Sequence, residues 1–300
     1  MQGQTTPAQS AGSATSVAAL RKPRLPTVER YSTHYVRYNC PISLKGANQS
    51  THTAEVKFPT GPKLAVVKAF SLREKGWVNE ALAWALGEAL DVGVPPESIL
   101  LAVSAADLAS ATEPELVHAR DQLGSLGPIM LWCATRLDLK PPQYAWRLNW
   151  ERAATSKPRG RKLAAFDAWL GNCDRIAQNA PYWMSRGHIA AIDHERLAFN
   201  QDWRLGVPIH MDVKGGVVTH LMSAVRDAIN KKVLKANEAT QLVSELAVIS
   251  ATHAETLASC HAEAEALVAD NFSTNEAQNL LTFLADRATQ DYINSRLEQL

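Results

Sequence analysis

Hydrophobic residues follow two different periods along this chain of 300 residues. In the first half they recur at every second position or in short runs bounded by turn residues, which favours β-strands. Residues 55–58 and 64–70 flank a turn that contains Pro and Gly, and they predict a hairpin. Residues 98–103 and 128–133 predict two further strands. The first half is therefore expected to be rich in strands.

Helical periodicity dominates the second half, where the predicted helices cover residues 163–170, 218–234, 237–268 and 273–299. Two further helices are predicted in the first half, at 76–90 and 113–123. The helix at 273–299 begins with Ser273 and Glu276, which have the spacing of a capping box. Two short strands are expected at 180–184 and 188–192. Strands followed by helices predict an α+β fold.

Composition excludes several classes of protein. Apolar residues make up 46% and charged residues 20% of the chain, as in ordinary globular proteins. The formal net charge of +1 gives no global field for nucleic acid or an anionic membrane. No apolar run approaches the roughly 18 residues of a membrane span, and the four cysteines form no CxxC motif. We expect a soluble cytoplasmic protein whose residues 1–28 form a disordered leader.

Three polar residues follow the predicted helix 163–170. Asp174 and Asn179 stand five positions apart, and Asp193 ends the apolar run 189–192. Taken alone, an Asp and an Asn in such a turn are more often caps. The same spacing occurs in the kinase catalytic loop H-R-D-x-x-x-x-N, which a metal-binding Asp follows further along the chain. Asp193 at the mouth of a buried strand favours this second interpretation.

Lys68 and Glu80 are candidates for an ion pair in the first half. Lys68 lies within the apolar strand 66–70, where an unpaired ammonium would be costly to bury. A lysine at the sheet edge that extends its amine to water is the alternative. The helix around Glu80 is apolar or small on nearly its whole circumference, so this carboxylate needs a counter-ion. Lys68 is the natural partner, as in the lysine–glutamate pair of protein kinases.

These segments together resemble the HipA-like kinases, bacterial relatives of the protein-kinase fold. Residues 165–175, Asn179 and 192–194 carry the resemblance in the second half, and 67–70 with 77–81 carry it in the first. The resemblance implies a two-lobed fold. The N-terminal nucleotide-binding lobe would cover residues 29–136, and the helical catalytic and substrate lobe would cover 137–300.

The resemblance also implies the chemistry. Asp174 would be the catalytic base, Asn179 and Asp193 would bind Mg²⁺, and Lys68, held by Glu80, would contact the phosphates of ATP. It further implies serine/threonine phosphorylation of a protein substrate. The best-known members of the family are toxins paired with a DNA-binding antitoxin, so an antitoxin is a possible partner.

Two further segments are candidates for nucleotide contacts. Residues 46–51, which include Ser50, could cradle phosphates with their N–H groups, although an ordinary polar loop explains them equally well. Residues 132–135, which include Cys133, fall where a kinase hinge would meet adenine, and a plain core strand also fits them. The sequence departs from protein kinases in having His194 and Glu195, instead of Phe and Gly, after Asp193.

Other functions remain open from the sequence. A phosphoinositide-type lipid kinase shares the Asp-Arg loop, but we find no basic or cysteine-rich patch for docking to a membrane. A pseudokinase acting as an interaction module would need none of the five polar residues. His188 and His194 could form a metal pair, although structural histidines are more common at strand ends. The basic run 157–162 is interpreted as a solvated linker.

Overall fold

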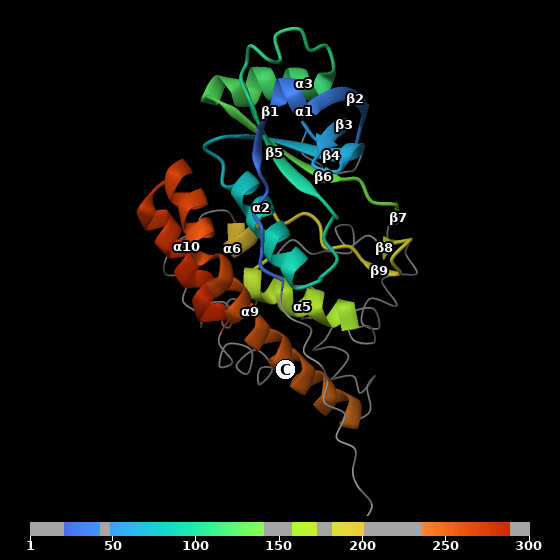
Figure 1. Ribbon diagram of the computed structural model, residues 1–300, viewed down its shortest axis with the longest axis vertical. Coiled ribbons are helices and arrows are strands. Elements are labelled where there is room, and N and C mark those ends of the chain that lie inside the picture. Colours follow the sequence, from blue (N-terminus) through green and yellow to red (C-terminus); the bar gives the residue numbers. More distant parts are fainter. Residues whose placement is uncertain (1–20, 43–48, 141–157, 173–181, 201–235, 289–300) are drawn as a thin grey trace, which may run out of the picture.

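The computed structural model describes residues 21–42, 49–140, 158–172, 182–200 and 236–288. Within them the chain is a mixed α and β protein with a six-stranded sheet and helices (Figure 1). The strands are β1 Val28–Arg30, β2 Tyr35–Pro41, β3 His52–Phe58, β4 Gly61–Ser71, β5 Ser98–Val103, β6 Ile129–Thr135, β7 Leu139–Lys140, β8 Tyr182–Trp183 and β9 His188–Ile189. The helices are α1 Tyr31–His34, α2 Gly76–Ala89, α3 Pro114–His118, α5 Pro158–Leu170, α6 Leu197–Asn200, α9 Ala236–Asn271 and α10 Thr274–Arg287.

The large sheet has the strand order β1-β5-β6-β4-β3-β2. The predicted hairpin is formed by β3 and β4, with Phe58 opposite Gly61 across a tight turn. The strands expected at 98–103 and 128–133 are present as β5 and β6, and both pair antiparallel. Strand β1 is the exception, because it runs parallel to β5. Strands β7, β8 and β9 form a separate three-stranded sheet.

The two faces of the large sheet belong to two different hydrophobic cores. Alternation along β4 places Val67 and Ala69 in the core that contains Leu116 and Ala119 of the α3 region. Phe70 and Trp132 belong to the other core, which includes α2. This second core continues from α2 into α5, α9 and α10, as the side-by-side packing of these helices in Figure 1 shows. A polar side chain on the α2 face of the sheet therefore lies between the sheet and the helices.

Helix α2 is buried on nearly its whole circumference, as its sequence predicts. Beyond its C-terminus Asp91 adopts a left-handed conformation with φ 52°, and the N–H of Val92 donates to the carbonyl of Gly87. A Cβ at Gly87 would lie 2.6 Å from Cγ1 of Val94, so a glycine is required for this close return of the chain. The helix is thus locked between the sheet and the segment that follows it.

Two expectations from the sequence are corrected here. Residues 21–28 of the expected leader are ordered, because Leu25 packs on the core and the carbonyl of Thr27 accepts a hydrogen bond from the N–H of Leu100 at 2.9 Å. The basic run is not a linker either, since α5 begins at Pro158 and includes it. Its cations find acceptors on other elements: Arg161 pairs with Glu245 of α9 at 2.5 Å, and Lys162 donates to the carbonyl of Leu90, just after α2, at 3.2 Å.

Helix α9 closely matches its prediction, whereas α5 begins five residues earlier than expected and α10 ends at Arg287, before the predicted 299. Helix α10 starts at the expected cap, where the hydroxyl of Ser273 accepts the N–H of Glu276 at 3.2 Å. The helix expected at 113–123 divides into α3 and a π-helical turn over Ala119–Leu123. The strands expected at 180–184 and 188–192 are short, as β8 and β9. The helix expected at 218–234 lies outside the described residues.

Candidate active site

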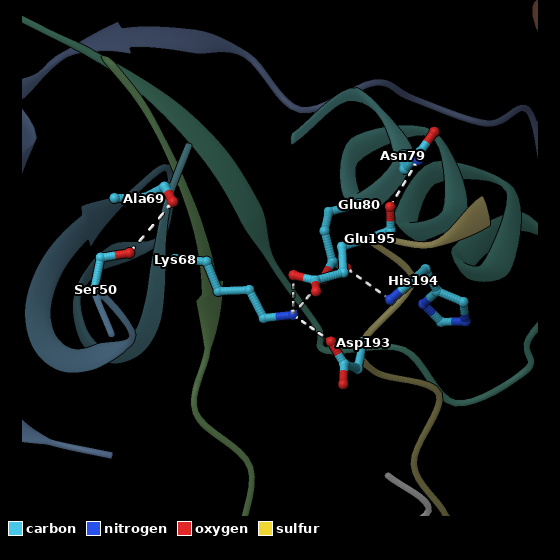
Figure 2. Close-up of polar contacts among 8 residues, drawn as sticks. All are labelled: Ser50, Lys68, Ala69, Asn79, Glu80, Asp193, His194 and Glu195. Carbon is cyan, nitrogen blue, oxygen red and sulfur yellow. Dashed lines mark hydrogen bonds and ion pairs between the residues drawn. The ribbon is translucent and has the colours of Figure 1, made fainter. Parts of the chain in front are cut away.

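Lys68 lies on the α2 face of β4 and forms the expected ion pair with Glu80. The distance from Lys68 Nζ to Glu80 Oε1 is 2.6 Å (Figure 2). Glu80 comes from the buried helix α2, and its side chain is 1% exposed. The lysine also lies over the ring of Trp132, its partner residue on β6, at 5.8 Å from the ring centroid. The strand and the helix thus fix both charges inside the protein.

Asp193 contacts the same lysine from a different part of the chain. Its Oδ1 lies 2.5 Å from Lys68 Nζ, although 125 positions separate the two residues. Asp193 follows the short strand β9 and has a left-handed backbone with φ 65°. Aspartate tolerates this conformation better than most residues, but it still needs support from the surrounding structure. The two residues meet between the sheet and the helices.

Glu195 is a third acidic residue at this lysine, and sequence reasoning did not identify it. Its Oε2 lies 3.7 Å from Lys68 Nζ. Burial raises the pKa of Glu195, and the charges of Asp193 and Glu80 add to this effect while Lys68 opposes it. The available signal was only that Glu195 is a second acidic residue close in sequence to Asp193, because the backbone at Asp193 is left-handed and has no strand period that would place both side chains on one side.

In this cluster the ammonium of Lys68 meets the carboxyl groups of three residues, Glu80, Asp193 and Glu195. Burial by itself would lower the pKa of Lys68, but the negative charges of Asp193, Glu80 and Glu195 outweigh burial and raise that pKa above its usual value. Lys68 therefore stays protonated. Among the described residues in contact here, three carboxyl groups surround one ammonium, an arrangement that favours the approach of a further cation.

The cluster offers the ligands that a hard divalent cation prefers. One carboxylate oxygen from each of Glu80, Asp193 and Glu195 lies within 4.8 Å of the other two. The side chains of Asp193 and Glu195 are 27% and 24% exposed, so solvent reaches them, whereas Glu80 is enclosed. Carboxylate oxygens bind Mg²⁺ and Ca²⁺. The residues present therefore fit a magnesium site at Asp193.

Backbone hydrogen bonds tie this acidic segment to α2. The N–H of His194 donates to Glu80 Oε2 at 3.2 Å, and the side-chain amide of Asn79 donates to the carbonyl of Glu195 at 2.7 Å. Both appear in Figure 2 as dashed lines between the helix and the segment. Glu80 therefore has one oxygen on Lys68 and the other on the backbone beside Asp193.

The C-terminal end of α5 leads to the segment that contains Asp174 and Asn179. Gly171 has φ 62°, and the N–H groups of Gly171 and Asn172 donate to the carbonyls of Ala168 and Asp167, which is the Schellman arrangement. Arg287 of α10 also donates to the carbonyls of Ala168 and Trp169. The helix end is thus tightly held. Asp174 and Asn179 themselves lie outside the described residues, and their roles stay predictions.

Ser50 and Cys133 are not brought to this cluster. Alternation along β6 places Cys133 in the core on the face of the sheet opposite to Lys68, and its neighbour Trp132 faces the lysine instead. Ser50 is buried, donates to the carbonyl of Ala69 at 3.3 Å, and lies apart from the lysine in Figure 2. The nucleotide contacts expected from the backbone groups of residues 46–51 and 132–135 do not depend on these side chains, and they stay predictions.

The two histidines considered as a metal pair have separate environments. His188 is buried, and its Nδ1 lies 2.8 Å from the carbonyl oxygen of Ile189. His194 is buried between α2 and α5, and its ring meets Phe166 edge-on at a centroid distance of 5.7 Å. Each histidine therefore makes its own packing or hydrogen-bonding contacts within the fold, as structural histidines do.

Comparisons with known proteins give a limited answer. No protein-family model matches the chain, and no curated protein matches it. Among solved structures, the chain is similar to a Helicobacter pylori proinflammatory kinase, CtkA, with 14% sequence identity and a TM-score of 0.39. That match covers 88% of this chain and 96% of the other. Within the described residues, no helix is both long and apolar enough to cross a membrane.

Proposed function

We propose that this chain is an ATP- and magnesium-dependent kinase that transfers the γ-phosphate to a serine or threonine hydroxyl of a protein. The observation that carries the proposal is the position of Lys68, which contacts both Glu80 of a buried helix and Asp193 in the irregular segment after β9. Protein kinases need a strand lysine paired with a helix glutamate and a metal-binding aspartate in place together. The same three residue types meet here.

Each residue then has a role. Lys68 would contact the phosphates of ATP, and Glu80 would hold the lysine in place. Asp193, with Glu195 beside it, and Asn179 would hold Mg²⁺. When bound, the metal would neutralise the negative charge of the phosphates. The nucleotide would lie between residues 29–136 and 137–300, in keeping with the two-lobed division that the sequence resemblance implies.

Asp174 would act as the base. Its carboxylate would accept the proton of the attacking hydroxyl while the hydroxyl oxygen bonds to phosphorus and the bond to ADP breaks. Lys68 would remain protonated throughout, since the neighbouring carboxylates raise its pKa. The protein substrate, and an antitoxin partner in the manner of HipA-type toxins, belong to the same proposal.

Labelled ATP tests the proposal directly. Purified protein is incubated with γ-labelled ATP and Mg²⁺, alone, with a cell lysate and with phosphoinositide vesicles, and Asp174→Asn serves as the inactive control. We expect label on protein serine or threonine that this control does not give. Label on lipid alone would indicate a lipid kinase. If wild-type protein transfers no label and binds no ATP with Mg²⁺, a catalytic role is wrong.

A further inference from the structure

Asp193 is held in a conformation that its own backbone does not favour. Left-handed φ values in residues other than glycine are strained, and they persist where the surrounding structure imposes them. The φ of Asp193 is 65°, and its carboxylate meets Lys68 only from the place that this backbone gives it. Some neighbouring group must therefore hold the segment.

The next residue, His194, has contacts on both sides. Its backbone N–H donates to Glu80 Oε2 on α2 at 3.2 Å. This N–H belongs to the peptide bond that follows Asp193, so its direction is set by the ψ angle of Asp193. The hydrogen bond thus restrains the backbone of the aspartate directly.

The imidazole of His194 is anchored on α5. Its Nε2 lies 3.7 Å from Asp167 Oδ1, and its ring packs edge-on against Phe166. Asp167 is fully buried and accepts a hydrogen bond from the side-chain amide of Asn172 at 3.0 Å. The histidine, 2% exposed, is thereby enclosed between two helices that are far apart in sequence.

We propose that His194 is a positioning residue that holds the Asp193 carboxylate at Lys68, through its backbone bond to Glu80 and the seat of its ring between Phe166 and Asp167. The inference rests on the proposed function, in which Asp193 binds the metal. Residues that orient a metal ligand typically contribute about 10–100-fold in metal affinity. Loss of the ring should lower Mg²⁺ affinity by a factor in this range.

The test measures binding in the full-length chain, without catalysis. Calorimetry gives the affinity for Mg²⁺ in the presence of a non-hydrolysable ATP analogue, and the affinity for the analogue without metal. We expect His194→Ala to weaken Mg²⁺ binding about 10–100-fold and to change metal-free nucleotide binding less than about twofold. His194→Gln should recover most of the loss, because its amide nitrogen lies about as far along the side chain as Nε2 and can donate toward Asp167.

His188→Ala is the matched control, since it removes a second buried histidine that contacts neither Asp193 nor Glu80 in the described structure. Equal Mg²⁺ affinity in wild-type and His194→Ala, or an equal loss in His188→Ala, would overturn the proposal. Should His194→Ala fail to fold, Asp167→Asn replaces it, with the same expectation of weaker Mg²⁺ binding and the same outcome against it.

A failure of the proposed kinase function can be distinguished from a failure of the positioning role of His194. If wild-type protein binds no Mg²⁺ with nucleotide, the kinase assignment fails, and amide hydrogen exchange in the ligand-free protein still tests the positioning. Exchange over residues 193–197 should then be faster in His194→Ala than in His188→Ala. Equal exchange in the two variants would contradict the role of His194.

Discussion

The two sides of the lysine cluster are built in different ways. Lys68 and Glu80 come from a regular strand and a regular helix, and the period of each element determines which way the side chain points. Asp193 and Glu195 come from an irregular segment with a left-handed residue, which hydrogen bonds from α2 and the packing of α5 hold in place. The first side is specified locally, and the second depends on contacts between distant parts of the chain. Substitutions should therefore act differently on the two sides.

The largest effect is expected at Asp174, the predicted base, which lies outside the described residues. Asp174→Asn keeps the size of the side chain and removes the proton acceptor. General-base catalysis contributes about 10²–10⁴ in rate, so kcat should fall at least 100-fold while KM for ATP changes little. Steady-state kinetics with labelled ATP measures both. The control is Asp91→Asn, at an exposed aspartate that follows the C-terminus of α2, and this variant should keep the wild-type kcat. Wild-type kcat in Asp174→Asn would exclude this base.

Asp193 should separate metal binding from proton transfer. Asp193→Ala removes the exposed carboxylate at Lys68, so ATP with Mg²⁺ should no longer raise the melting temperature. Asp174→Asn should largely keep this stabilisation, because a base acts mainly in the transition state. Thermal melts with and without Mg²⁺ check both variants. The opposite pattern would mean that the two aspartates exchange roles.

The next largest effect is expected on stability, when the contact by which α10 supports α5 is removed. Arg287 is buried and donates to two carbonyls at the C-terminus of α5. Arg287→Met leaves these acceptors buried without their charged donor, and we expect a loss of about 3 kcal/mol in the free energy of unfolding. Arg159→Met removes a more exposed arginine of α5 and should cost less than about 1 kcal/mol. Denaturant unfolding compares them, and equal losses would argue against the capping role.

A smaller, pH-dependent effect is expected at His253 on α9. This histidine is fully buried against Trp169, with ring centroids 4.4 Å apart, and burial lowers its pKa from 6.5 to about 3. Below pH 6.5 the unfolded chain binds a proton that the folded protein does not, so stability falls as the pH drops toward 3. At pH 5 the loss amounts to about 2 kcal/mol.

His253→Phe keeps the stacked ring and removes the titration. Its unfolding free energy should fall less between pH 7 and pH 5 than that of the wild type, by about 2 kcal/mol. The exposed His261 on the same helix is the control, and His261→Phe should leave the pH profile unchanged. A wild-type slope in His253→Phe would show that other groups govern the acid sensitivity of the helical side.

The sequence was a good guide wherever a single element decides the outcome. The burial of α2 and the pairing of Lys68 with Glu80 follow from apolar periodicity and from the cost of burying a lone charge. The location of Cys133 could have been predicted too, because side chains alternate along β6 and those of Cys133 and Trp132 therefore point to opposite faces of the sheet. The basic run over 157–162 was misinterpreted, because its charges suggest solvent, while their partners Glu245 and the carbonyl of Leu90 belong to distant parts of the chain.

The sequence by itself therefore determined the long strands β3–β6, the buried helix α2 and the two charges of the Lys68–Glu80 pair, because period and burial are local properties. The tertiary structure alone decided that Asp193 and Glu195 meet Lys68 across 125 and 127 positions, that His194 is seated between α2 and α5, and that Arg287 caps α5. The physical reason is that an irregular backbone has no period of its own. Its conformation is set by hydrogen bonds from whichever elements the fold brings beside it.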